Sequence, residues 1–474
     1  MTSILHAAAE FYNYFILGYF FAIDLIYLAL LIVALHTILN YVRKNRYANY
    51  EVILQSEFTV PISILAPAYN EEANIIESVQ SLMMLDYAQF EVVVINDGSM
   101  DSTLRKLIES FKMKKVTYDY QESIPSKQVR GIYRSPLPAF NRLLVVDKEN
   151  GGKADALNAG INAARYPLVC CIDADSLLES DALLRVVKPF LEHPKEMVAT
   201  GGIVRIVNGC EVDRGHVREI RLSKNWIPVF QVVEYLRAFL SGRMGWTGLN
   251  ALLVISGAFG LFKRSAVIEA GGYNTNTVGE DMELVVRLHK LMRREKKDYM
   301  VAFVPDPVCW TEAPSSLKVL ARQRNRWHRG LIETLKMHKD MLFRSEYGSV
   351  GLVALPYFLL FELAGPVVEA TGVVFVLFSF ALGGVDVTFF LVFLLLAIVY
   401  GIFLSVGAVL LEEYSFHRYP KPGDLMKLLL FGVLENFGYR QLTAWWRVKA
   451  TWDYLRGVKS WGAMSRVGFG KKAP

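Results

Sequence analysis

The sequence predicts an α/β domain that faces water, contains a parallel sheet and has membrane-spanning helices on both sides. Hydrophobic residues make up 53% of the 474 positions, and they concentrate at the N-terminus and after residue 350. Between these regions no apolar stretch is long enough to cross a bilayer. Short apolar runs alternate there with helical patterns, which is typical of a parallel sheet covered by helices on both faces.

The first apolar segment, Phe15–Leu39, is long enough to span a membrane and contains one acidic residue, Asp24. A signal peptide is disfavoured because no basic region precedes the segment and no small-residue cleavage site follows it. Basic residues at 43–46 follow directly, so the positive-inside rule places this flank in the cytoplasm. We expect one membrane helix within residues 1–45 and a cytoplasmic domain after it.

Four apolar runs in the middle of the chain predict buried strands, each ending in polar residues. They are Ile62–Ala66, Glu91–Ile95, a run within residues 142–153 and a run that starts at Leu168. Ligands bind at the carboxyl ends of the strands in such sheets. We therefore expect the four polar clusters to converge on one crevice, in a domain that covers residues 58–312.

Two further spans are predicted within residues 350–411. Val350–Leu382 contains Pro356 and Pro366, which indicates a broken or kinked helix, and Val385–Leu411 indicates a second helix. The short turn between these two helices would face outward. The chain is therefore expected to be a multi-pass protein of the cell membrane, with its large domain in the cytoplasm.

The C-terminal region, residues 412–474, is ambiguous. A fourth crossing by Asp424–Leu442 would place the basic tail outside, against the charge rule, so we predict an interfacial or re-entrant helix and a cytoplasmic tail. Lys224–Gly242 and Leu317–His338 are amphipathic, and each fits either a helix on the sheet or a helix at the membrane surface. Because the second leads directly into a span, we prefer the membrane surface for residues 313–345.

The net charge of +6 arises largely from basic residues beside the apolar segments. This placement favours contact with the lipid bilayer and with an anionic substrate. Nucleic-acid binding is disfavoured because no basic stripe interleaved with aromatic residues lies outside the membrane-proximal parts. The four cysteines show no metal-ligand spacing and are expected to be reduced core residues.

Two carboxylates, Asp173 and Asp175, follow the run that starts at Leu168. Residues two apart on a strand point to the same side, so both side chains would face one ligand. A hard cation such as Mg²⁺ or Mn²⁺ would remove their repulsion and hold a diphosphate. A simpler interpretation is a helix cap, because Asp175 precedes a helical pattern.

Polar residues near the other strand ends fit a nucleotide. Asp97 could accept a base N–H, although Asp-Gly-Ser also forms turns and helix caps. Tyr69 would stack on the nucleoside and Glu71 would hydrogen-bond to it. Lys153 follows two glycines and supplies a cation near phosphate, although the motif is not that of a phosphate loop.

Two clusters near the end of the domain fit transfer of a group to a hydroxyl. Glu280 and Asp281 either complement a helix macrodipole or place a carboxylate that accepts the proton of an attacking hydroxyl. Gln323, Arg326 and Trp327 lie on one face of a predicted helix. Arg326 would hold a leaving diphosphate and Trp327 would carry a sugar ring, although a basic membrane-surface helix explains the same pattern.

The combination resembles the family 2 processive glycosyltransferases: cellulose, chitin, hyaluronan and bacterial poly-N-acetylglucosamine synthases. The resemblance covers roughly residues 58–345. Gly279 departs from the family, in which many members have Thr before Glu-Asp, and residues 117–142 form an insertion without a functional assignment. The matching motifs, in chain order, are Asp97, Asp173 with Asp175, Gly-Glu-Asp at 279–281 and Gln-x-x-Arg-Trp at 323–327.

The resemblance implies a GT-A fold, a uridine diphosphate sugar as donor, Mg²⁺ or Mn²⁺, and inversion at the anomeric carbon. It also implies that Ser256–Phe262 lines the acceptor site. Together with the arguments from residue chemistry, the expected sites are catalytic Asp281; acceptor-binding Glu280, Gln323 and Trp327; donor-binding Tyr69, Glu71, Asp97, Lys153, Asp173 and Arg326; and metal-binding Asp173 and Asp175.

We therefore expect an enzyme that adds a sugar such as N-acetylglucosamine to a growing β-linked polysaccharide and couples this addition to export. With so few spans, a channel is hypothesised to need an accessory subunit or a homo-oligomer. The main competing function is transfer of one sugar to a lipid-linked acceptor. Two functions are less favoured: a catalytically idle nucleotide or cyclic-dinucleotide receptor, and a sugar nucleotidyltransferase, which needs no spans.

Overall fold

The computed structural model describes residues 2–45, 59–213, 215–381 and 387–458. Among these residues, ten strands form one sheet in the order β3-β4-β5-β2-β1-β6-β11-β8-β12-β7, and β9 pairs with β10 separately. The strands are β1 (Ile62–Ala68), β2 (Phe90–Asp97), β3 (Lys114–Val116), β4 (Val129–Arg134), β5 (Leu143–Lys148), β6 (Leu168–Ile172), β7 (Leu177–Leu178), β8 (Met197–Ile206), β9 (Glu211–Asp213), β10 (His216–Glu219), β11 (Phe259–Lys263) and β12 (Met300–Thr311).

Helices of two kinds accompany the sheet. Those of the sheet domain are α3 (Ile75–Met83), α4 (Thr103–Ser110), α5 (Lys153–Ala163), α6 (Ala182–Glu192), α7 (Trp226–Leu236), the π-helical turn η2 (Arg237–Arg243), α8 (Met244–Gly248), α9 (Arg264–Glu269) and α10 (Glu280–Arg294). The others are α1 (Thr2–Asn45), α11 (Leu317–Met337), α12 (Leu355–Tyr357), the π-helical turn η6 (Phe358–Leu363), α13 (Gly365–Ala381), α14 (Val387–Leu394), α15 (Tyr400–Ser415), α16 (Pro422–Leu434) and α17 (Arg440–Leu455).

The four predicted strands are β1, β2, β5 and β6, and they lie side by side in parallel. Their carboxyl ends therefore meet at one edge, as expected. The sheet is mixed, however, because β11 runs antiparallel to both β6 and β8, and β4 runs antiparallel to β5. An apolar run reveals burial of a strand but not its direction, which explains why the prediction of a parallel sheet holds for only part of it.

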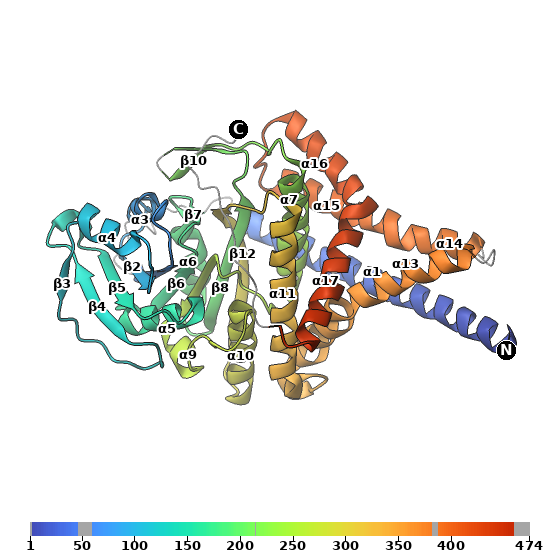
Figure 1. Ribbon diagram of the computed structural model, residues 1–474, viewed down its shortest axis with the longest axis horizontal. Coiled ribbons are helices and arrows are strands. Elements are labelled where there is room, and N and C mark those ends of the chain that lie inside the picture. The colour runs from blue at the N-terminus through green and yellow to red at the C-terminus, as the bar shows by residue number, and fades with distance from the viewer. Residues whose placement is uncertain (1, 46–58, 214, 382–386, 459–474) are drawn as a thin grey trace.

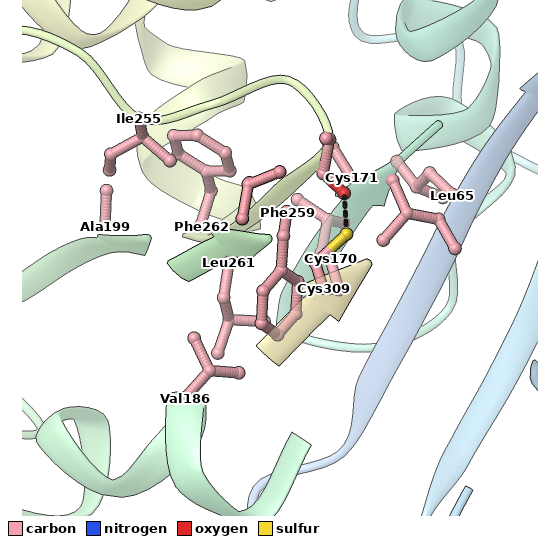
Figure 2. Close-up of a cluster of buried hydrophobic side chains, with 14 of the residues drawn as sticks. Leu65, Cys170, Cys171, Val186, Ala199, Ile255, Phe259, Leu261, Phe262 and Cys309 are labelled. Atoms are coloured by element: carbon pink, nitrogen blue, oxygen red, sulfur yellow. Dashed lines mark hydrogen bonds between the residues drawn. The ribbon is translucent and has the colours of Figure 1, made fainter. Parts of the chain in front are cut away.

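The centre of the sheet is a close-packed apolar core beneath the predicted carboxylates. Figure 2 shows side chains from β1, β6, β11 and β12 meeting there, with Val186 of α6 packing beneath them. Cys170, Cys171 and Cys309 are buried and reduced, and Cys309 Sγ donates a hydrogen bond to the Ala258 carbonyl over 3.5 Å. These three cysteines are core residues, as the sequence predicts, whereas Cys210 is only half-buried and packs against the core from outside.

The insertion at residues 117–142 packs against α5 and adds β4 to the sheet. Asn162 on α5 accepts hydrogen bonds from the backbone N–H groups of Ser123 and Ile124, at 3.1 and 3.0 Å. Asp155, on the first turn of α5, accepts one from the Lys127 N–H at 3.1 Å. The insertion therefore braces the helix that begins at Lys153.

Three of the described helical segments are long and apolar enough to cross a membrane: Glu10–Asn45, Val350–Phe375 and Val387–Ser415. They correspond to the three predicted spans, and part of the predicted outward turn lies outside the described residues. The second segment is broken, as expected, because π-helical turns flank α12 and a bend at Ala364 precedes α13. Figure 1 shows α13, α14 and α1 extending away from the sheet domain.

The region predicted as one interfacial or re-entrant helix at Asp424–Leu442 contains parts of two helices, and its place relative to the membrane stays a prediction. Gly438, at φ +105°, breaks the chain between α16 and α17, a conformation that side chains other than glycine rarely adopt. Figure 1 shows α17 beside α11, between the sheet and the long apolar helices, and the two helices are in contact. The sheet domain and the membrane helices therefore meet along this helix pair.

Candidate active site

A cavity of about 620 Å³ connects the sheet edge with the helices that lead into the membrane. Its wall includes seven of the predicted site residues: Lys153, Asp173, Glu280, Asp281, Gln323, Arg326 and Trp327. On the membrane side it includes Phe358 and Glu362 of η6 and Arg447 of α17. The residues predicted for catalysis and for acceptor binding therefore surround one cavity. The basic side chains Lys153 and Arg326, which are expected to bind the donor, line the same cavity.

Lys153 is the first residue of α5, and its ammonium pairs with the carboxylate of Asp173. Its Nζ also lies 3.8 Å from Glu280 Oε1. Burial opposes the charge of Lys153, but the carboxylates of Asp173 and Glu280 outweigh this effect and raise its pKa. Burial also raises the pKa of Glu280. A cation at a helix N-terminus is thus held where an anionic diphosphate would be favoured.

The carboxylate pair lies just beyond β6, which ends at Ile172. Asp173 to Asp175 form a turn in which the Ser176 N–H donates to the Asp173 carbonyl at 3.0 Å. The expectation that a strand points both side chains to one side is therefore wrong, because the strand has already ended. The Asp173 side chain is 28% exposed and lines the cavity, whereas Asp175 is buried.

The donor chemistry of this pair fits a hard cation. Carboxylate oxygens are the ligands that Mg²⁺ and Mn²⁺ prefer, and Asp173 reaches the cavity in which a diphosphate would lie. Among the described residues no cluster of three or more metal-ligating side chains occurs. A cation held by Asp173 and Asp175 stays a prediction.

Asp281 stands in the first turn of α10 and faces the glycine-containing segment before β11. Its Oδ2 accepts a hydrogen bond from the Gly257 N–H at 3.1 Å, and its Oδ1 accepts one from the Met282 N–H at 2.8 Å. The carbonyl of Gly257 accepts a hydrogen bond from Lys153 Nζ at 3.3 Å. Gly257, within the predicted acceptor segment Ser256–Phe262, thus connects the predicted base with the donor-side lysine.

The Gln-x-x-Arg-Trp motif lies on α11, so Gln323, Arg326 and Trp327 share a helix face and all line the cavity. Trp327 is 43% exposed, and Arg324 lies over its ring with the guanidinium carbon 4.4 Å from the ring centroid. Arg324 in turn pairs with Glu234 of α7 at 2.7 Å. These contacts hold the indole in one orientation, with much of its surface still accessible.

A close contact holds α11 against the Gly-Glu-Asp motif. A Cβ atom added to Gly279 would lie 2.8 Å from Gly330 Cα, and one added to Gly330 would lie 2.8 Å from Gly279 Cα. Glu333, one turn further along α11, accepts hydrogen bonds from Thr277 Oγ1 at 2.8 Å and the Val278 N–H at 2.9 Å. Gly279, the departure from the resembled family, therefore allows this backbone approach.

Asp97 lies in a more enclosed environment than a nucleoside contact suggests. It is buried at the end of β2, and its carboxylate accepts hydrogen bonds from Lys148 Nζ at 2.7 Å, the Gly151 N–H at 3.0 Å and the Gly152 N–H at 2.8 Å. In this arrangement Asp97 shapes the loop that precedes Lys153. The nucleoside contact remains a prediction.

Tyr69 and Glu71 follow β1 and do not line the cavity. Tyr69 is largely exposed, and the Glu71 N–H donates to Thr103 Oγ1 at 2.9 Å. Both residues stand at the carboxyl edge of the sheet, so they remain candidates for the nucleoside rather than for the transferred sugar.

Several cavity residues were not predicted. Arg243, the last residue of η2, places its guanidinium carbon 3.8 Å from the centroid of the Phe239 ring, and burial lowers its pKa to about 10. Phe358, Glu362 and Arg447 also line the cavity. Glu362 could have been found from the sequence, because an acidic residue inside an apolar span often marks a functional site.

The chain matches the family model described as glycosyltransferase-like family 2 over residues 60–330. A poly-β-1,6-N-acetyl-D-glucosamine synthase of Staphylococcus epidermidis is 28% identical over 338 residues, which cover 69% of this chain and 70% of that protein. The corresponding synthase of Staphylococcus aureus strain COL is 29% identical over 303 residues, which cover 64% of this chain and 60% of that protein.

Among solved structures, the mannosyltransferase PcManGT from Pyrobaculum calidifontis, in complex with GDP-Man and Mn²⁺, shows 18% identity and a TM-score of 0.48. That match covers 88% of this chain and 99% of the other. The family match includes the whole parallel part of the sheet, the predicted carboxylates Asp173, Glu280 and Asp281, and the motif on α11. Because the family match extends over more than half of this chain, the chain belongs to the glycosyltransferase-like family 2 and is a glycosyltransferase.

Proposed function

We propose that this glycosyltransferase transfers N-acetylglucosamine from its uridine diphosphate to the end of a growing β-linked glycan, with inversion at the anomeric carbon. The observation that carries the proposal is one cavity lined by the Lys153–Asp173 pair, Asp281 and Trp327. The two relatives named as poly-β-1,6-N-acetyl-D-glucosamine synthases support this choice of sugar and of product. The domain would work on the cytoplasmic face of the cell membrane.

In the proposed reaction, Asp281 takes the proton of the acceptor hydroxyl while that oxygen attacks the anomeric carbon. The bond from this carbon to the diphosphate oxygen breaks as the new bond forms, and uridine diphosphate leaves with the electron pair. Lys153 and Arg326 supply positive charge where the departing diphosphate becomes more negative. Trp327 provides the surface on which the acceptor ring lies, and Gln323 and Glu280 stand beside it to bind its polar groups.

Asp173 and Asp175 would hold Mg²⁺ or Mn²⁺, which supplies further positive charge to the leaving diphosphate when bound. Asp173 is paired with Lys153 in the structure, so the carboxylate and the ammonium lie together where the diphosphate would bind. Lys153 would hold the donor phosphates there. Tyr69, Glu71 and Asp97 would define the nucleoside end of the same donor site.

Coupled export is part of the proposal because the cavity wall continues to Glu362 and Arg447, beyond the sheet domain. Three described segments are apolar enough to span a membrane, so an accessory subunit or a second copy would complete a passage. Inside-out vesicles that receive donor on their outer face should accumulate glycan protected from added glycosidase. Glycan that stays entirely accessible would contradict coupled export.

The test of the function is a donor screen with the full chain in lipid nanodiscs. Each nucleotide sugar is supplied with Mg²⁺ or Mn²⁺, and the mass and linkage of the product are determined. Uridine diphosphate N-acetylglucosamine should give a polymer. A single sugar on a lipid would support the non-processive function, and no transfer from any donor, with binding of a cyclic dinucleotide, would support a receptor.

A further inference from the structure

We propose that Phe358, Glu362 and Arg447 form a second acceptor subsite, which binds the uncharged sugar ring next to the ring on Trp327. This inference rests on the proposed elongation of a glycan. The three residues line the same cavity as Asp281 and Trp327. They lie outside residues 60–330, so the family match does not account for them.

The polar part of the subsite is an ion pair between Glu362, inside a candidate membrane span, and Arg447 of α17. Arg447 Nη2 lies 3.0 Å from Glu362 Oε2, and the Tyr357 hydroxyl donates a hydrogen bond to Glu362 Oε1 at 3.1 Å. The Arg447 and Glu362 side chains remain 28% and 30% exposed. Ionisable groups are costly in spans and usually face the interior of the protein or a cavity, and both members of this pair line the cavity.

The chemistry of the three side chains matches a neutral hexose. The carboxylate of Glu362 accepts hydrogen bonds from sugar hydroxyls, and the guanidinium of Arg447 donates to neighbouring ones. Phe358 adds an aromatic surface for the apolar face of the ring. Because the two charges cancel, the pair favours an uncharged ring over a phosphate.

The subsite is linked directly to the first one. Arg447 Nε donates to His328 Nδ1 at 3.3 Å, and His328 directly follows Trp327 on α11. Burial lowers the pKa of His328 to about 3, so its ring is neutral near neutral pH and accepts this hydrogen bond. His328 Nε2 also lies 2.9 Å from Thr451 Oγ1 of α17. Trp327 and Arg447 are thus held at a fixed separation, as two consecutive rings of one chain require.

The test uses the full chain in nanodiscs, with N-acetylglucosamine and its β-1,6-linked di- and trisaccharides as acceptors, the linkage being that named for the relatives. The measured quantity is the ratio of kcat/KM for the trisaccharide to that for the monosaccharide. We expect Glu362→Gln and Phe358→Leu each to lower this ratio about tenfold, because one charged hydrogen bond or one ring contact is lost.

The matched control is Glu179→Gln. It removes another partly exposed ion pair, in which Arg418 Nη1 lies 2.9 Å from Glu179 Oε1 and the side chains are 23% and 24% exposed. This pair joins the sheet domain to the segment after the candidate spans, and it does not line the cavity. The control should therefore keep the wild-type ratio.

Three outcomes overturn the subsite. One is a wild-type ratio in both Glu362→Gln and Phe358→Leu. Another is an equal loss for acceptors of every length, including complete loss, which would indicate a role in folding or in the chemical step. If the wild-type protein transfers sugar to no acceptor, the proposed function fails and the subsite fails with it, which separates that failure from the other two.

Discussion

At the scale of single residues, the two carboxylates with proposed roles in the reaction have different partners. Asp173 is paired with Lys153. Asp281 accepts hydrogen bonds from two backbone N–H groups and faces the cavity, and no ion pair of Asp281 is found among the described residues. We therefore predict that Asp281→Asn keeps affinity for uridine diphosphate and lowers turnover by about 10²–10⁴-fold. Calorimetric titration and the initial transfer rate measure the two quantities. Asp340→Asn, which alters a surface pair with Lys290, is the control.

A near wild-type transfer rate in the Asp281 variant would show that Asp281 is not the base.

The other site residues show how much of the site the sequence alone predicts. The convergence of Lys153, Asp281 and Trp327 on one cavity could be predicted from residue type and motif spacing, whereas their chemical roles stay predictions. The enclosure of Asp97 could not, because it depends on Lys148, a fully buried lysine on a neighbouring strand. Arg243 was missed because a π-helical turn, absent from the sequence pattern, brings it to the cavity.

At the scale of elements, the close approach of α11 to the loop before α10 sets the distance from Asp281, the proposed base, to Trp327, the proposed acceptor surface. A Cβ atom at Gly330 would lie 3.0 Å from the Gly279 backbone N and closer to its Cα, so neither neighbour can yield by a side-chain rotation. We predict that Gly330→Ala separates Asp281 from Trp327 and lowers kcat at least about tenfold. Transfer assays at saturating donor test this.

Gly407→Ala is the matched control, because Gly407 also lies within a helix and its added Cβ would meet no atom within 4 Å. Equal activity of the two variants would show that the contact between α11 and the loop does not position Asp281 relative to Trp327.

The helices and strands themselves were largely predictable from the sequence. Apolar runs identified β1, β2, β5 and β6, and the three spans were found from length and hydropathy. The break at Gly438 was missed because glycine is also tolerated inside helices.

At the scale of the whole molecule, ion pairs fasten the sheet domain to the segments that follow residue 400. Arg205 at the end of β8 pairs with Glu412 at the end of α15, over 2.8 Å, and both side chains are almost fully buried. Two other ion pairs also join the sheet domain to the chain after residue 400: Arg237 with Glu435, and Arg418 with Glu179. No spacing rule relates residues so far apart in the chain, so this docking could not be read from the sequence.

The buried pair leads to a prediction about stability. Glu412→Leu leaves the Arg205 guanidinium buried without its partner, which should destabilise the fold by about 3–5 kcal/mol. Adding Arg205→Met should recover most of that loss, because two apolar side chains avoid the cost of an isolated buried charge. Both changes are measured as shifts in the midpoint of thermal unfolding in detergent, which is detected by size-exclusion chromatography of the protein that stays folded. Asp213→Asn, from the exposed pair with Arg218, should leave the midpoint almost unchanged. A double variant that melts as early as Glu412→Leu would show that the pair acts through specific geometry rather than through charge.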